Sequence, residues 1–193
     1  MARALAARLG LRYLDTGAMY RAVAFAALQR AVDPDDADKV TRLAQGLDIR
    51  VEEGVTTVDG VDASVEIRGP EVTRAVSTVA ANARVRAELV SRQREWIRAN
   101  DGGVVEGRDI ASVVWPDADL KVYLTANLAV RAERRSKEVA DLDYSRVEAD
   151  MARRDTIDTS RDADPLQLAA GAVVVDTSDR SVEEIVDDLA GRL

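Results

Sequence analysis

Residues 104–109, with the sequence Val-Val-Glu-Gly-Arg-Asp, combine a short apolar run with a carboxylate, a glycine, an arginine and a second carboxylate. The β-branched residues predict a buried strand whose carboxyl end carries the charges, at the edge where open α/β sheets bind ligands. Gly107 removes side-chain bulk where the backbone must turn or a ligand must approach. The planar guanidinium of Arg108 suits phosphate. Taken alone, the pattern also fits a strand that leaves the core into a solvated turn.

A second polar strand end lies near the start of the chain. Residues 11–14 are an apolar strand candidate, and Asp15-Thr16-Gly17 leads directly into a helical pattern that carries Tyr20 and Arg21. Arginines recur outside these strand ends, at Arg21, Arg86, Arg108, Arg131, Arg134, Arg154 and Arg161. Because phosphoryl transfer needs positioning and charge neutralisation more than a covalent nucleophile, this distribution favours phosphate handling.

The composition excludes several other chemistries. The chain has no histidine, which excludes Ser-His-Asp hydrolysis, His-ligated zinc and a His general base, and it has no cysteine for disulfides or thiolate metal sites. The net charge of −8 argues against a general nucleic-acid-binding surface. No apolar run approaches the ~20 residues that a membrane helix needs, and the opening residues are too polar for a secretory signal. We therefore expect a cytoplasmic protein.

Alternating strands and helices must position the candidate residues. Besides 11–14 and 104–105, apolar strands are predicted at 120–124 and 171–176. Helical periodicity recurs at 1–9, 16–31, 40–47, 70–79, 84–98, after 125 and at 182–189, where Ser181 and Glu184 form a capping box. This alternation predicts an α/β fold, a three-layer arrangement of one parallel sheet with helices on both faces.

Two segments depart from that alternation. Residues 47–67 change to a two-residue period, with short strands at 49–52, 56–59 and 61–65 and a hairpin signal at Asp59-Gly60. They predict a small antiparallel β-meander inserted on the main sheet. Residues 137–161 are strongly charged and carry only a thin apolar stripe from Val147 and Met151, so we expect a mobile arm. An arginine-bearing arm of this kind could close over a site and exclude water.

Together these segments resemble the bacterial cytidylate kinases, which are nucleoside monophosphate kinases. The matching segments cover almost the whole chain in the family's order: LDTGAMYRAV (14–23), IRGPEVTRAVSTVAANARVRAEL (67–89), QRE (93–95), VVEGRDIASVVWPDADLKVYLTA (104–126), RAERR (131–135), RRDTIDTSRDADPL (153–166) and VVVDTS (173–178). The meander fits cytidylate rather than adenylate kinases. The resemblance implies a P-loop-kinase-like fold with a single domain over 1–193, in which residues 47–67 belong to a CMP-binding insert and residues 137–161 form a lid.

The resemblance also implies an activity, the phosphorylation of CMP or dCMP by ATP to give CDP or dCDP and ADP, as part of pyrimidine metabolism. The implied CMP-binding residues are Thr16, Arg86, Asp109 and Arg161 around the cytosine, Ser77, Arg154 and Asp158 at the ribose, and Arg21 and Arg108 at the acceptor phosphate. Glu106 stands at an acidic position of the family near the transferred phosphate, where many members have Asp. Arg134 and the arm would cover the ATP. The implied catalytic residues are Arg108, Glu106 and Arg154, and no residue is assigned as a metal ligand.

Each of these residues also has a plainer interpretation. Arg131, Arg134 and Arg135 share one helix face and could be solvated, pairing with Glu133 or Glu138. Arg154, Asp158 and Arg161 could form ordinary ion pairs, which are usually worth under ~1 kcal/mol. Ser77 could be a serine on a helix surface, and Tyr20 is better suited to packing than to chemistry. The order of all of them along the chain is what favours a site.

The start of the chain departs from the family. Cytidylate kinases begin with a strand and a loop of the type G-x-x-x-x-G-K-[ST], which holds the donor phosphates and Mg²⁺. None of the lysines, Lys39, Lys121 and Lys137, follows a glycine, so these 193 residues lack the motif. Met1 aligns inside the helix that follows the loop. We therefore expect a truncated chain, or one that has lost its donor site, with weak or no kinase activity. Strands 11–14 and 104–105, which would flank the missing strand, should leave a gap or pair directly.

Three functions remain open at this point. The first is a cytidylate kinase, which would use ATP and Mg²⁺ as its donor complex. The second is a non-catalytic remnant that still binds CMP. The third is an arginine-rich RNA-binding module, which the negative net charge and the scarcity of stacking aromatics oppose. The expected partners are CMP or dCMP and ATP, with neither nucleic acid nor membrane, and the expected state is a monomer.

Overall fold

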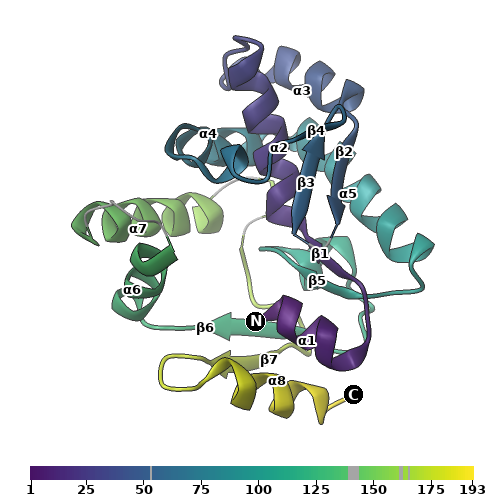
Figure 1. The fold of residues 1–193 in the computed structure, drawn as a ribbon, viewed down its shortest axis with the longest axis vertical. Helices are drawn as coiled ribbons and strands as arrows, with labels where there is room; N and C mark the ends of the chain where they lie inside the picture. The colour runs from purple at the N-terminus through teal and green to yellow at the C-terminus, as the bar shows by residue number, and fades with distance from the viewer. Residues whose placement is uncertain (53, 139–143, 161–162, 165) are drawn as a thin grey trace.

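A computed structural model describes residues 1–52, 54–138, 144–160, 163–164 and 166–193 of the chain. In Figure 1, helix α2 (Thr16–Gln29) runs through the upper part of the molecule, and helix α8 (Val182–Ala190) lies at the opposite end. Helices and parallel strand pairs make up most of the fold between them. The predicted α/β class is therefore confirmed.

Two short parallel strands bring the predicted polar ends together. Strand β1 (Tyr13–Asp15) pairs with β5 (Val104–Glu106), and Asp15 lies opposite Glu106 in the register. The direct pairing of these strands was one of the two alternatives expected from the sequence. Since both strands run in the same direction, their carboxyl ends meet at one edge.

A second parallel pair forms separately. Strand β6 (Val122–Thr125) pairs with β7 (Val173–Asp176), and Tyr123 lies opposite Val174. Among the described residues no strand pairing joins β5 to β6. The four parallel strands therefore form two pairs, and the interruption lies between β5 and β6. From the sequence, a possible gap was expected between residues 11–14 and 104–105 instead.

The predicted β-meander is confirmed. Strands β2 (Ile49–Glu52), β3 (Val55–Val58) and β4 (Val61–Asp62) pair in that order and antiparallel. Asp59 and Gly60 both have a positive φ, 50° and 80°, as a tight hairpin turn requires. The last strand is shorter than expected. The carboxylate of Asp62 accepts hydrogen bonds from the backbone and hydroxyl groups of Ser64, which turn the chain into the 3₁₀ turn η1 (Glu66–Arg68).

The helices follow the predicted periodicity closely. Their bounds are α1 (Ala2–Leu9), α2, α3 (Ala37–Gly46), α4 (Pro70–Ala81), α5 (Ala83–Ala99), the short π-helical turn η2 (Ile110–Val114), α6 (Leu128–Glu138), α7 (Tyr144–Ser160) and α8. The predicted capping box between Ser181 and Glu184 opens α8, and Gly10 ends α1 in the left-handed conformation. The charged segment 137–161 contains helix α7, in which Val147 is buried. Its mobility stays a prediction.

Helix α2 is the centre of the larger hydrophobic core. Ala22, Val23, Ala24 and Ala27 are fully buried, so the helix is covered on all sides rather than along one stripe. Around it pack α3, α4, α5 and the meander (Figure 1). This burial fixes Thr16 and Arg21, which lie on the early turns of α2, relative to β5 and α4.

A smaller core lies at the other end of the molecule. Leu5 of α1 packs there with Val175 of β7 and with Ile185, Val186 and Leu189 of α8. In Figure 1, α1 lies between the two strand pairs, with β1 and β5 above it and β7 and α8 below. Helices α6 and α7 project on one side. Within the described part of the chain, no helix has both the length and the apolar composition needed to cross a bilayer.

Candidate nucleotide-binding site

The paired ends of β1 and β5 begin the candidate site. The Thr16 hydroxyl, buried at the first turn of α2, donates a hydrogen bond of 2.7 Å to the backbone oxygen of Glu106. The Asp15 carboxylate accepts a hydrogen bond from the backbone of Ala18 and so caps α2, and it also pairs with Arg68. The two predicted polar segments are therefore one structural unit.

Gly107 is required by the close approach of α2 to this edge. A Cβ atom at Gly107 would lie 2.4 Å from the Thr16 hydroxyl oxygen and 2.7 Å from the Ile110 side chain. These distances are shorter than any normal contact, so a side chain would push the loop away from α2. The sequence prediction of a glycine needed for close approach is thereby supported.

Glu106 has a partner that the sequence did not suggest. The Tyr13 hydroxyl donates a hydrogen bond of 2.5 Å to the Glu106 carboxylate from the neighbouring strand. Burial raises the pKa of Tyr13, and the hydrogen bond and negative charge of Glu106 raise it further. Tyr13 thus remains a donor at neutral pH and holds one carboxylate oxygen of Glu106.

Arg86 and Asp109 form the most deeply buried ion pair of the candidate site. Their side chains are 2% and 7% exposed. The Arg86 guanidinium also contacts Asp164 at 2.8 Å through Nε, donates to the Ala80 backbone oxygen and lies over the Tyr20 ring. Two residues predicted to surround a cytosine are therefore adjacent, and Tyr20 packs against Arg86.

Arg21 is held from the side of α4. Its Nη1 atom donates to the backbone oxygen of Ile67 at 3.1 Å and to the Thr73 hydroxyl at 2.9 Å. The side chain is almost fully buried. Ser77 lies half-buried one turn further along α4. The geometry places both residues on helices that pack against each other, as a common pocket requires.

Arg108 lies beside the helix α7. Its Nη1 atom is 3.5 Å from one oxygen of the Asp155 carboxylate, and Arg131 of α6 contacts the other oxygen at 2.6 Å. Arg131 is therefore not a solvated arginine paired with Glu133, which was the plainer interpretation of the sequence. The Glu133 carboxylate pairs with Lys137 instead.

Arg134 lies apart from this group. It donates to the hydroxyl and backbone oxygens of Thr177, just beyond β7, at 3.0 and 2.5 Å. It therefore joins α6 to the carboxyl end of the second strand pair. Its predicted role toward ATP stays a prediction.

The remaining predicted residues cannot be placed in the same way. Arg154 and Asp158 belong to α7, but their side chains lie outside the described part of the structure, and Arg161 lies outside the described residues altogether. Their assignment to the ribose and the base stays a prediction.

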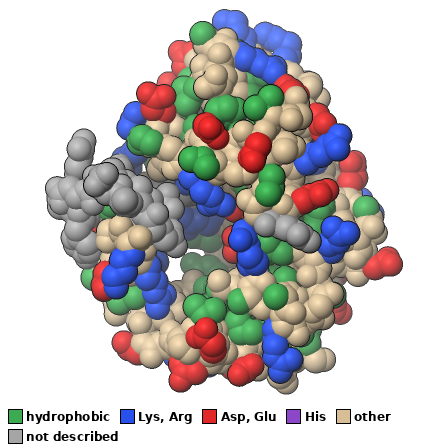
Figure 2. All heavy atoms as spheres, viewed as in Figure 1, with side chains coloured by type: hydrophobic (Ala, Val, Ile, Leu, Met, Phe, Trp, Pro, Cys, Tyr) green, Lys and Arg blue, Asp and Glu red, His purple; other side chains and the backbone are tan. Residues whose placement is uncertain are grey.

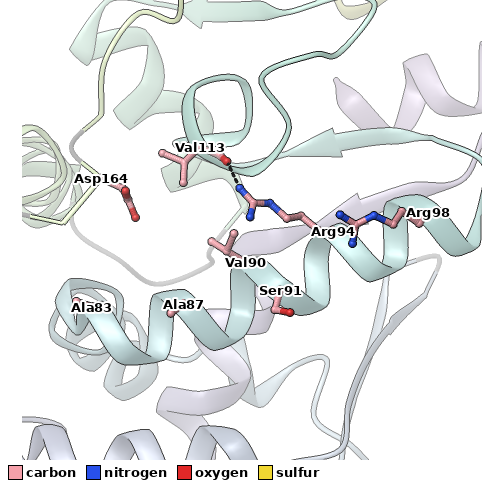
Figure 3. Close-up of a pocket in the computed structure, with 8 residues that line it drawn as sticks. All are labelled: Ala83, Ala87, Val90, Ser91, Arg94, Arg98, Val113 and Asp164. Atoms are coloured by element: carbon pink, nitrogen blue, oxygen red, sulfur yellow. Dashed lines mark hydrogen bonds between the residues drawn. The ribbon is translucent and has the colours of Figure 1, made fainter.

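A groove of about 480 Å³ runs along α5. Figure 3 shows Asp164 and Ala83 toward one end of it and Arg94 and Arg98 toward the other. Arg94 donates to the backbone oxygens of Val113 and Val114, and Arg98 lies over the Trp115 ring. These two arginines pack the η2 region against α5, whereas Asp164 contacts Arg86 and so connects the groove to the candidate site.

Positively charged side chains gather between the upper and lower parts of the molecule. Figure 2 shows an opening between the upper and lower parts, with Lys or Arg side chains beside it. Among the described residues no group of three acidic, histidine or cysteine side chains could hold a metal ion. The guanidinium groups of the site suit an anion.

Sequence reasoning missed Tyr13, Asp155 and Asp164 as members of the site. Tyr13 reads as a strand residue, and its position opposite Val104 becomes visible only with the strand register. The two aspartates stand in a segment full of charges, so nothing local distinguishes them from solvated carboxylates. The one local signal for Asp155 was its position directly after Arg154, a residue assigned to the site from the sequence.

The fold is of the α/β class, and arginine and carboxylate side chains gather at the carboxyl ends of its first pair of parallel strands. A family model described as cytidylate kinase matches residues 1–192. The chain belongs to the cytidylate kinase family.

Individual relatives agree with this assignment. The chain is 46% identical to the cytidylate kinase of Mycobacterium avium (strain 104), with 98% of this chain and 86% of the relative covered. It is 45% identical to the cytidylate kinase of Nocardia farcinica (strain IFM 10152), with 98% and 85% covered. Similarity also extends to a bifunctional pantoate ligase/cytidylate kinase of Parasynechococcus marenigrum (strain WH8102), at 45% identity over 97% of this chain and 39% of that protein.

Proposed function

We propose that this chain binds CMP at the carboxyl ends of β1 and β5, as the acceptor half of an ATP-dependent cytidylate kinase. The reaction would transfer the terminal phosphoryl group of ATP to a phosphate oxygen of CMP or dCMP, giving ADP and CDP or dCDP. The observation that carries the proposal is the buried ion pair between Arg86 of α5 and Asp109, just after β5, in a chain of the cytidylate kinase family. Thr16 is bonded to the backbone at the end of the same strand.

The buried ion pair suits recognition of a pyrimidine. Cytosine presents an amino donor and two acceptors along one edge, and a carboxylate beside a guanidinium offers the complementary groups. Asp109 would accept from the amino group and Arg86 would donate to the acceptors. Uracil carries a carbonyl in place of the amino group, so it would face the Asp109 carboxylate with an unpaired oxygen. We therefore propose that this pair distinguishes CMP from UMP.

The acceptor phosphate would be held by Arg21 and Arg108. A guanidinium can bind two phosphate oxygens at once. Arg108 follows the strand that ends at Glu106, and Arg21 lies on the helix that begins at Thr16. Transfer of a phosphoryl group depends on alignment and on neutralisation of charge. Arg108, Glu106 and, from α7, Arg154 would supply these, with Arg154 and Asp158 also at the ribose and Arg161 at the base.

The donor half of the reaction needs a site for the ATP phosphates. These 193 residues contain no G-x-x-x-x-G-K-[ST] sequence, which holds those phosphates in the family. We propose that the chain shows weak or no phosphoryl transfer by itself, with Arg134 left as the ATP contact. The alternative is a non-catalytic CMP-binding remnant. The monomeric state and the cytoplasmic location also remain predictions.

Calorimetric titration of the folded chain with CMP, UMP and AMP tests the acceptor site. Selective binding of CMP is expected, and Arg86→Met should abolish it in a protein whose circular dichroism still shows helix. Equal binding of the three nucleotides would contradict the roles given to Arg86 and Asp109. A separate assay of CMP-dependent ADP formation tests the donor side, where rapid turnover would overturn the proposed inactivity.

A further inference from the structure

Two carboxylates, one on α7 and one shortly after it in the chain, contact arginines that the proposed function assigns to CMP. Asp155 of α7 contacts Arg108, and Asp164, which follows α7 in the chain, contacts Arg86. The first arginine would hold the acceptor phosphate and the second the base. The same region of the chain thus places one negative group at each of two proposed subsites.

Asp155 is bound in the manner of an oxyanion. Arg108 approaches one of its oxygens and Arg131 approaches the other, from a loop and from a helix on different sides. Two guanidinium groups that converge on separate oxygens of one anion form an arrangement that suits phosphate equally well. All three side chains are between 29% and 37% exposed, so solvent and small anions can reach them.

Asp164 is a second carboxylate on an arginine that already has one. Asp109 is buried beside Arg86, whereas Asp164 is 35% exposed and contacts Nε of the same guanidinium. Its backbone has a φ of 48°, in the left-handed region that is unfavourable for residues other than glycine, although aspartate tolerates it better than most. An acceptor atom of a base could occupy the same Nε donor in place of the Asp164 carboxylate.

We propose that Asp155 and Asp164 are internal substitutes for the nucleotide, which close the acceptor site until CMP displaces them. Asp155 occupies the phosphate position on Arg108, and Asp164 occupies a base position on Arg86. The inference rests on the proposed function. It predicts that the two carboxylates compete with different parts of CMP, so their removal strengthens binding.

Titrations with CMP and with cytidine separate the two roles. Asp155→Asn should lower the dissociation constant of CMP about twofold to fivefold and leave that of cytidine unchanged, because cytidine has no phosphate. Asp164→Asn should lower both. Glu148→Gln, which removes a charge from the same helix but lies outside these contacts, serves as the matched control and should change neither. Weaker CMP binding by either aspartate variant would show a supporting role and overturn the proposal.

Hydrogen exchange in the absence of any nucleotide tests the closure independently. Amide protons of α7 should exchange faster in Asp155→Asn than in the wild type and in Glu148→Gln, since the variant loses the contacts with Arg108 and Arg131. Unchanged exchange would overturn the closing role of Asp155 whatever the titrations give. If the wild type binds no CMP while exchange responds as expected, the proposed function fails and the closure of α7 onto Arg108 stands.

Discussion

Arg86 shows how much a single side chain in this site depends on its surroundings. The guanidinium is 2% exposed and has Asp109 as a buried partner. Removing one member of a buried ion pair leaves the other charged in a place that water does not reach. The residue therefore matters for stability as well as for the proposed binding of a base.

Arg86→Ala should lower the free energy of unfolding by about 3 kcal/mol, because Asp109 is left buried without its main counter-charge. Urea denaturation measures this. Arg84→Ala is the matched control on the same helix, since Arg84 pairs with Asp38 in an exposed position and should change stability little. An equal loss of unfolding free energy in the two variants would show that the buried pair stabilises the fold no more than the exposed pair.

Gly107 marks the closest approach between the strand edge and α2. Gly107→Ala should destabilise the protein by about 1–3 kcal/mol, since the new methyl group collides with Thr16 and Ile110. It should also weaken CMP binding in the same titration. Gly46→Ala is the control, because a methyl group there meets nothing within 4 Å, and it should be neutral or stabilising. A Gly107→Ala variant with the stability of the wild type would refute the tight packing of Gly107 against Thr16 and Ile110.

At the scale of elements, helix α8 provides a measurable pH dependence. Hydrogen bonds from Ser181 to the Glu184 carboxylate lower the pKa of Glu184 below its usual 4.5. A carboxyl group whose pKa is lower in the folded state stabilises the fold above its unfolded pKa and loses that effect as the pH falls through the folded value. Below that value both states carry the protonated group.

Glu184→Gln should therefore lower the melting temperature at pH 7, and the difference from the wild type should shrink as the pH falls below 4.5. Glu183→Gln removes a charge from the same first turn without the bond to Ser181, so it should show a smaller difference at pH 7. Thermal melts at several pH values check this. A difference that grows toward low pH would contradict the direction given for Glu184.

The elements were largely predictable because each has a local cause. The meander follows from alternating residues around Asp59-Gly60, and α8 follows from its capping box and apolar stripe. The pairing of β1 with β5 was foreseen as one of two alternatives. The separation of the parallel strands into two pairs was not foreseen, because strand pairing depends on neighbours that no short segment encodes.

The candidate site was only partly predictable from the sequence. Thr16, Glu106 and Asp109 follow apolar strands, so their position at a sheet edge could be expected from the sequence. Asp155 and Asp164 reach the arginines only through the path of α7 across the molecule. A charged helix face is solvated in most proteins, and only the fold shows which of its members meet a partner.

At the scale of the whole molecule, the hydrophobic clusters around α2 and around Ile185 are unequal. The cluster around α2 includes many buried residues from α2 to α5, whereas the buried residues of the cluster around Ile185 come from α1, β7 and α8. A region with less buried apolar surface opens at a lower free energy. The lower part of the molecule should therefore unfold locally before the upper part.

Hydrogen exchange under native conditions should thus show slower exchange for the amides of α2 than for those of β7 and α8. Ile185→Ala should accelerate exchange in β7 and α8 while leaving α2 nearly unchanged. Val23→Ala, in the larger cluster, is the comparison and should accelerate exchange throughout. Uniform exchange over both clusters in all three proteins would indicate a single cooperative unit.

The break between the parallel pairs has a consequence for handling the protein at high concentration. Within the described residues β5 and β6 each have a strand partner on one side only, and such edges can pair with a strand of another molecule. The net charge of −8 opposes that encounter by mutual repulsion. Salt shortens the range of the repulsion to about 8 Å at physiological ionic strength. Aggregation should therefore set in as salt is added, and dilute buffer should keep the protein in solution longest.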